Sequence, residues 1–263
     1  MAEPRFLVVR LGSLGDIVHT FPAVAGLHES FPEAEIVWLT HPRWRALVES
    51  SELATDIWET ETRSYHSLRK HFMTAIDYQG LWKSAALPFF GGVSHRIGFS
   101  SQTIREIGVP ILYTDRIRCT QTHIVDQNGE LSQRAGARNG VAPVALSVPS
   151  IQEVFVLQLL RRLAVERYVV LSPAGGWRSK CWPPDRYGAL CQKIHGLLGL
   201  RCVLNYGPGE DDLISAVKAA SGEADPIAHN GSLGQLMALL RNAVCIVGGD
   251  TGPLHLAVAL GTP

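Results

Sequence analysis

The sequence predicts an α/β protein made of two Rossmann-like halves with parallel sheets. Short apolar runs alternate with segments of helical spacing along the whole chain, as in sheets covered by helices on both faces. A stretch rich in glycine, proline and small residues at 139–150, NGVAPVALSVPS, interrupts this alternation before the pattern restarts. We therefore expect an N-terminal domain at residues 1–150 and a C-terminal domain at residues 151–263.

The N-terminal half begins with an apolar run at residues 6–10, FLVVR, which predicts a strand. A glycine-containing loop follows, and then a helical pattern from about residue 16 to residue 29. The other elements that we expect in this half are strands at 36–39, 73–77 and 96–99 and a helix at 44–49.

The C-terminal half repeats the pattern with strands at 168–171, 202–205 and 244–247 and helices at 183–198, from about 211 and from about 232. Its last strand ends at two glycines. Asp250 and Thr251 then stand where a helix N-cap belongs, and Pro253 stands close to the first helical position. The chain is thus expected to pass from a buried strand through glycine into a capped helix.

Composition excludes several classes of function. The 24 basic and 24 acidic residues balance, so there is no global electrostatic case for binding nucleic acid. The five cysteines form no C-x-x-C pair, which favours reduced thiols over a metal site. The N-terminus lacks the pattern of a signal peptide, and no run approaches the roughly 20 apolar residues that span a bilayer. We expect a cytoplasmic protein.

The loop after the first strand, residues 11–16, reads LGSLGD and places Asp16 at the carboxyl end of that strand. It matches neither the dinucleotide G-x-G-x-x-G pattern nor the phosphate-binding P-loop. A carboxylate flanked by glycines at this position suits a general base. It also suits a helix N-terminal charge that the helix dipole stabilises, which spacing alone favours, so both interpretations stay open.

Three strand-end loops of the C-terminal half predict a nucleotide pocket. Ser179 and Lys180 supply a hydroxyl and an ammonium before a helix, and Glu210 is either a ribose ligand or a helix-start charge. The loop after the last strand offers free backbone N–H groups at a helix N-terminus, which suit phosphate, and His255 follows Thr251 by one helical turn. The set is Lys180, Glu210, Asp250, Thr251 and Gly252.

These residues resemble the bacterial heptosyltransferases of glycosyltransferase family 9, which add heptose to the inner core of lipopolysaccharide. Residues 249–255 (GDTGPLH) are similar to the most diagnostic motif of that family, and residues 178–183 and 14–20 are similar to two others. Residues 77–84 (DYQGLWKS), with Arg105, Tyr113 and His123, resemble segments of the acceptor domain. Those last features lean toward the members that modify the Kdo sugar.

The resemblance implies a GT-B fold, in which two Rossmann-like domains face each other, with ADP-heptose as donor and inversion at the anomeric carbon. It implies no metal and no cofactor. Asp16 matches the catalytic base of the family. Lys83 and Arg105 match acceptor residues, for an acceptor of the Kdo-lipid A type. The donor residues implied are Ser179, Lys180, Glu210, Asp250, Thr251, Gly252 and His255.

A lipid acceptor also implies peripheral contact with the cytoplasmic face of the inner membrane, through apolar residues near Leu87, Phe89 and Phe90. Members of the family continue beyond the Gly-Thr-Pro at 261–263. We therefore expect a C-terminal domain that is incomplete, with weakened donor binding and marginal stability.

Two other classes of protein fit part of the pattern. A sugar-nucleotide epimerase of the same fold would use the same nucleotide pocket, but it would need further acid and base groups around the sugar. A non-catalytic nucleotide-binding module would keep Lys180 and Thr251 and would have no use for Asp16. Loss of transfer in Asp16→Ala, with ADP binding retained, separates a glycosyltransferase from both.

Overall fold

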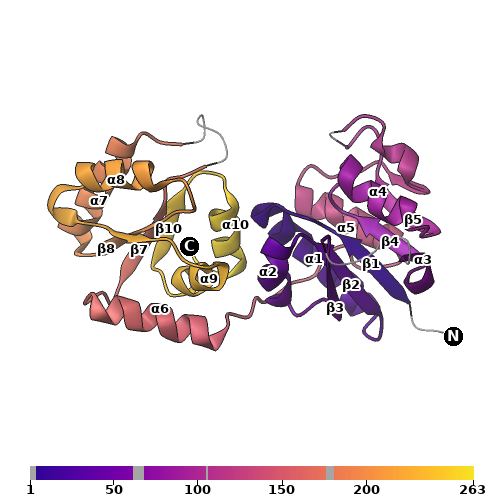
Figure 1. Cartoon of the computed structure of the whole chain (residues 1–263), viewed down its shortest axis with the longest axis horizontal. Coiled ribbons are helices and arrows are strands. Elements are labelled where there is room, and N and C mark those ends of the chain that lie inside the picture. Colours follow the sequence, from indigo (N-terminus) through magenta and orange to yellow (C-terminus); the bar gives the residue numbers. More distant parts are fainter. Residues whose placement is uncertain (1–3, 62–67, 105, 176–180) are drawn as a thin grey trace. The chain divides into compact units, whose positions relative to one another are not determined.

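The computed structural model describes residues 4–61, 68–104, 106–175 and 181–263. The chain divides into two compact units, Met1–Leu146 and Ser147–Pro263, drawn from indigo to magenta and from salmon to yellow in Figure 1. Each unit contains one sheet, and every strand pairing in the described part of the chain is parallel. The α/β class with parallel sheets is confirmed.

The sheet of the N-terminal unit has six strands in the order β3-β2-β1-β4-β5-β6. They are β1 (Arg5–Val9), β2 (Glu35–Thr40), β3 (Asp56–Glu59), β4 (Thr74–Asp77), β5 (His95–Phe99) and β6 (Asp115–Ile117). The order reverses between β1 and β4, because the chain first builds outward from β1 on one side and then on the other. Ligands of such sheets bind outside the carboxyl ends of the strands at this reversal.

Helices cover both faces of this sheet. They are α1 (Leu14–Ser30), η1 (Pro42–Trp44), α2 (Arg45–Glu49), α3 (Leu68–His71), α4 (Trp82–Phe90), η3 (Val109–Leu112) and α5 (Ile124–Arg134). Side chains alternate between the faces along each strand. Leu7 of β1 belongs to a buried cluster with Leu68 of α3, whereas Trp38 of β2 meets Phe21 of α1 with ring centroids 5.6 Å apart.

The C-terminal unit has four strands in the order β10-β7-β8-β9, namely β7 (Tyr168–Ser172), β8 (Arg201–Asn205), β9 (Ile227–His229) and β10 (Cys245–Gly248). Its helices are α6 (Ser150–Arg162), α7 (Pro184–Leu198), α8 (Asp211–Ala220), η5 (Gly222–Ala224), α9 (Leu233–Arg241) and α10 (Gly252–Ala259). Leu171, Tyr187 of α7 and Ile214 of α8 share one buried cluster. The Tyr168 hydroxyl donates to the Leu239 carbonyl of α9, 2.7 Å away.

None of the described helices combines the length and the apolar character that crossing a lipid bilayer requires.

The burial of His229, the last residue of β9, leads us to predict how the stability of the C-terminal unit depends on pH. His229 is 6% exposed, its Nδ1 has no hydrogen-bond partner among the described residues, and burial lowers its pKa from 6.5. On acidification the unfolded chain therefore binds this proton first, so stability is lost as pH falls from about 6.5 through the folded pKa.

We expect the calorimetric unfolding midpoint to fall between pH 7.5 and 5.5, and to fall less in His229→Gln. The exposed His195, in the last turn of α7, is the matched control, and His195→Gln should keep the wild-type dependence. An identical dependence in His229→Gln and wild type would contradict the assignment.

Candidate functional site

A pocket of about 660 Å³ opens in the N-terminal unit where β1 and β4 end. It lies at the reversal of strand order, where parallel α/β sheets place their ligands. The lining residues come from the segments that follow β1, β2, β3 and β4, together with α1 and α4. They are Leu11, Gly12, Ser13, Asp16, His41, Arg43, Trp44, Thr60, Gln79, Lys83 and Leu87.

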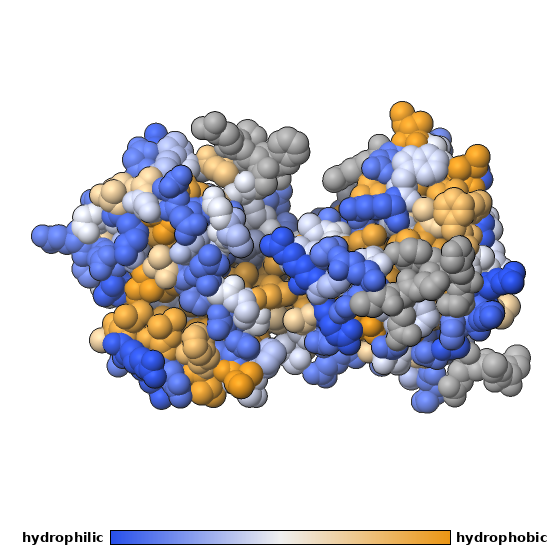
Figure 2. All heavy atoms as spheres, viewed as in Figure 1, coloured by the Kyte–Doolittle hydropathy of each residue, from blue (hydrophilic) through white to orange (hydrophobic). Residues whose placement is uncertain are grey.

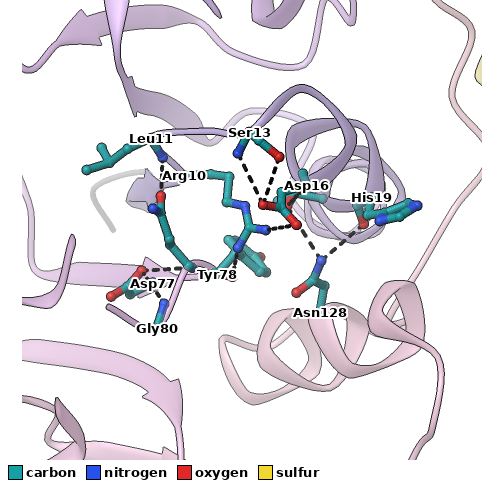
Figure 3. Close-up of polar contacts among 11 residues, drawn as sticks. Arg10, Leu11, Ser13, Asp16, His19, Asp77, Tyr78, Gly80 and Asn128 are labelled. Carbon is teal, nitrogen blue, oxygen red and sulfur yellow. Dashed lines mark hydrogen bonds and ion pairs between the residues drawn. The ribbon is translucent and has the colours of Figure 1, made fainter. Parts of the chain in front are cut away.

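Asp16 lies in the first turn of α1, where its charge complements the helix dipole. Its Oδ2 accepts hydrogen bonds from the backbone N–H and the hydroxyl of Ser13, both at 3.1 Å. Its Oδ1 lies 2.9 Å from Nη2 of Arg10. Figure 3 shows the carboxylate between these two partners. The Asp16 side chain remains 47% exposed, so a substrate hydroxyl can reach it.

The loop after β4 supports the loop that carries Asp16. Gln79 Oε1 accepts from the backbone N–H of Leu11 at 2.7 Å. Asp77, the last residue of β4, holds Gln79 in turn. The Asp77 Oδ1 accepts from the backbone N–H groups of Gln79 at 2.9 Å and Gly80 at 3.2 Å. The Asp77 Oδ2 accepts from the hydroxyls of Ser84 at 2.9 Å and Tyr113 at 2.7 Å.

Asp77 is fully buried, and burial raises its pKa although its four hydrogen bonds oppose this. Burial and the nearby Asp77 charge also raise the pKa of Tyr113. The Tyr113 hydroxyl therefore stays protonated as a donor. We interpret this network as the structural support of the pocket, because Asp77 is not among the residues that line it.

Lys83 is exposed in the first turn of α4 and lines the same pocket as Asp16. The predicted acceptor residue Arg105 lies outside the described residues. Its neighbour Glu106 accepts from the Trp82 N–H at 2.7 Å, at the N-terminus of α4. Of the predicted pair, Lys83 thus lines the same pocket as Asp16.

His41, Arg43 and Trp44 were not predicted as site residues. They follow β2, the neighbour of β1, and residue 44 was assigned instead to the start of a helix. The Arg43 guanidinium lies over the Trp44 ring, 4.9 Å from its centroid, and His41 Nε2 lies 3.5 Å from Glu61 Oε1. Their position directly after a predicted strand could have identified them as site residues, as the same kind of position identified Asp16.

The close approach of Gly12 to Trp44 allows a prediction about the part of the pocket that these two residues line. A Cβ at Gly12 would lie 2.7 Å from Nε1 of Trp44, so Gly12→Ala must displace the indole. Overpacking of this kind costs about 1–3 kcal/mol, and we expect the KM for the acceptor to rise roughly tenfold. Initial rates at varied acceptor concentration measure it. Gly196→Ala is the control, because nothing lies within 4 Å of that Cβ. An unchanged KM in Gly12→Ala would contradict contact between Trp44 and the acceptor.

In the C-terminal unit, β10, β7 and β8 are neighbours, so the loops that follow them lie along one edge of the sheet. Thr251 is the N-cap of α10, and Gly252 is its first residue. The Thr251 hydroxyl donates to the Gly249 carbonyl at 3.2 Å and makes no side-chain cap. His255 pairs with Asp250, with Nε2 and Oδ1 3.1 Å apart.

Glu210 closes its own loop, because its Oε2 accepts from the Gly207 N–H at 2.7 Å. It is also the N-cap residue of α8. Both interpretations offered for Glu210, ribose ligand and helix-start charge, are compatible with this place. The other predicted donor residues, Ser179 and Lys180, lie outside the described residues.

The described residues contain no cluster of three or more His, Cys, Asp or Glu side chains that could hold a metal ion.

Residues 62–263 match the model of glycosyltransferase family 9 (heptosyltransferase). The chain belongs to glycosyltransferase family 9. The family assignment and the enzyme class, a glycosyltransferase, confirm what the motifs predicted.

Named relatives agree with this assignment. The family 9 chain is 28% identical to lipopolysaccharide heptosyltransferase 1 of Escherichia coli O18:K1:H7 (strain RS218 / NMEC), over 98% of this chain and 84% of that protein. The solved structure of E. coli heptosyltransferase WaaC with ADP is similar, with a TM-score of 0.78 and 25% identity over 98% of this chain and 85% of that one.

The crystal structure of a family 9 glycosyltransferase from Veillonella parvula DSM 2008 is also similar, with a TM-score of 0.85 over 100% of this chain and 80% of that one. Because the two sequences are only 17% identical, this likeness shows the fold alone. Together with the two parallel sheets, these likenesses confirm the GT-B type of fold.

Proposed function

We propose that this glycosyltransferase transfers heptose from ADP-heptose to the inner core of lipopolysaccharide, with inversion at the anomeric carbon. The observation that carries the proposal is the half-exposed Asp16 carboxylate in a pocket that also holds Lys83. The heptosyltransferase relatives support the sugar, and the WaaC structure with ADP supports the nucleotide. In this proposal residues 1–150 bind the acceptor and residues 151–263 bind the donor.

The reaction is a single displacement. A hydroxyl oxygen of the acceptor attacks the anomeric carbon of heptose, and the bond from that carbon to the ADP oxygen breaks. The electron pair of that bond leaves with ADP, and the hydroxyl proton passes to Asp16. Thr251 and Gly252 at the start of α10, with Lys180, would stabilise the negative charge on the departing diphosphate.

The pocket suits an anionic sugar such as the Kdo of a lipid A precursor. Lys83, Arg43 and His41 supply cationic or hydrogen-bonding groups around Asp16, and Trp44 supplies an apolar ring. We expect Lys83→Met to raise the acceptor KM roughly 10- to 100-fold, because it removes a charge-assisted hydrogen bond, and to leave the donor KM unchanged. Lys193→Met, on α7, is the matched control. Equal effects on the two KM values would contradict the assignment.

A transfer assay with ADP-heptose, with and without a Kdo-bearing acceptor, tests the proposed function. Heptosyl transfer requires both substrates and releases one ADP for each heptose attached. An epimerase would convert ADP-heptose into an isomer without the acceptor. A nucleotide-binding module would bind ADP without turnover. Either of the last two results would overturn the proposal.

We also propose that the N-terminal unit contacts the inner face of the membrane that carries the acceptor lipid. Phe89 and Phe90 end α4 with exposures of 39% and 71%. Ile107, shortly before η3, and Ile111, within η3, are 95% and 69% exposed. Figure 2 shows hydrophobic side chains at this surface of the unit, over α4. The Arg96 guanidinium lies 5.3 Å from the Phe89 ring centroid and donates to the Leu112 carbonyl at 2.7 Å, so a fixed positive charge lies next to these apolar side chains.

Flotation with vesicles that contain anionic lipid tests this contact. We expect Phe89→Ser/Phe90→Ser to reduce the bound fraction severalfold, because it removes the exposed apolar area. Ile151→Ser/Phe155→Ser is the control, since those residues are exposed on α6 of the other unit. Equal flotation of the Phe89/Phe90 variant and wild type would contradict membrane contact through α4.

A further inference from the structure

Arg10, the residue after β1, is a buried arginine whose side chain is 5% exposed. Its backbone is fixed on the side of β2, because its N–H donates to the Leu39 carbonyl at 3.2 Å and its carbonyl accepts from Trp38 Nε1 at 3.2 Å. Its side chain runs in the other direction. Nη1 donates to the Tyr78 carbonyl after β4, and Nη2 meets Asp16 Oδ1 of α1 at 2.9 Å (Figure 3).

A buried guanidinium must have a partner, because arginine stays charged in proteins and an unpaired buried charge is strongly destabilising. Asp16 is the carboxylate that faces it. Exposed ion pairs contribute little, in part because two mobile side chains must be ordered. Here one partner is already immobilised by burial and by the Tyr78 carbonyl, so Asp16 is held against a fixed group.

The second oxygen of Asp16 is held from the other side by the Ser13 N–H and hydroxyl. Three donors therefore fix the plane of the carboxylate. A carboxylate has about four acceptor positions, so one remains for a further donor, and the exposed part of Asp16 lies in the pocket. An acceptor hydroxyl that donates there meets a base whose orientation is already set.

We infer that Arg10 is a positioning residue for glycosyl transfer: it orients the Asp16 carboxylate toward the acceptor hydroxyl and does not itself touch substrate. The inference rests on the proposed function, in which Asp16 is the base. Misplacing a reacting group by about 1 Å can cost roughly 100-fold in rate, so removal of Arg10 should act on kcat. Donor binding, which the proposal assigns to the other unit, should be unaffected.

The first experiment compares Arg10→Gln, Arg10→Lys and Arg5→Gln with ADP-heptose and a Kdo-bearing acceptor. We expect Arg10→Gln to lower kcat about 100-fold, with less than a twofold change in the donor KM. Arg10→Lys keeps a cation and should recover at least part of that loss. Arg5 is the matched control, since it begins β1, the strand that Arg10 follows, and pairs with Glu35 at 2.7 Å outside the pocket. Arg5→Gln should keep wild-type kcat.

The second experiment separates positioning from a general loss of structure. If Arg10 acts through Asp16, then kcat of Arg10→Gln/Asp16→Asn should equal that of Asp16→Asn within about threefold, because the two losses are not additive. The same comparison is made with Arg10→Lys and Arg10→Lys/Asp16→Asn, in case Arg10→Gln does not fold. Near-UV circular dichroism checks the folding of each variant.

Additive losses, or an unchanged kcat in the folded Arg10 variants, would overturn the positioning role. Wild-type turnover in Asp16→Asn alone would instead overturn Asp16 as base, so the two failures are distinguishable.

Discussion

Replacing Asp16 by asparagine is expected to lower kcat by roughly 10²- to 10⁴-fold, the range that general-base catalysis contributes. Asparagine keeps the shape of the side chain but cannot accept the proton of the acceptor hydroxyl. The proposal assigns donor binding to the other unit, so the affinity for ADP should not change. The rate of ADP release at saturating substrates measures the first effect, and calorimetric titration with ADP measures the second.

Asp126 provides the matched control for this variant. It is an exposed acid in the first turn of α5, as Asp16 is an acid in the first turn of α1, and it does not line the pocket. Asp126→Asn therefore removes a comparable helix N-terminal charge and should keep wild-type kcat. If Asp16→Asn retained more than half of the wild-type turnover, Asp16 would not be the base.

Replacing Asp77 by alanine is expected to lower the free energy of unfolding of the N-terminal unit by about 3 kcal/mol or more. The substitution removes the acceptor of four hydrogen bonds and leaves the buried hydroxyls of Ser84 and Tyr113 without it. The Gln79 and Gly80 amides lose their acceptor as well. Because Gln79 supports the loop of Asp16, activity should fall with stability.

Hydrogen exchange of the β1 and β4 amides measures the loss within the unit concerned. Glu33→Ala is the control, because this acid is exposed in the turn before β2, and surface changes of this kind stay within about 0.5 kcal/mol. A loss below about 1 kcal/mol in Asp77→Ala would show that water or neighbouring groups replace the carboxylate.

Local chemistry accounts for the elements that the sequence predicted. The apolar run at 6–10 corresponds to β1, and α1 begins after Ser13 with Asp16 in its first turn. The short strands β3, β6 and β9, which read DIWE, DRI and IAH, were not predicted. Each has only three or four residues with polar groups among them, and each forms because a neighbouring strand supplies its hydrogen bonds.

The sequence by itself determined the class of the fold, the family, and which chemical groups stand at the ends of strands. Asp16 after β1, Lys83 after β4 and the start of α10 at Gly252 are consequences of local pattern. Only the tertiary structure decided which of these groups meet. Pairing of β1 with β2 and β4 brings Asp16 together with Lys83, Arg43 and Trp44.

The same pairing anchors the Arg10 side chain on the Tyr78 carbonyl, where it contacts Asp16. No pattern of spacing contains this contact. Strand order depends on the burial and hydrogen bonding of residues far apart in the chain, whereas helices, caps and turns depend on neighbours.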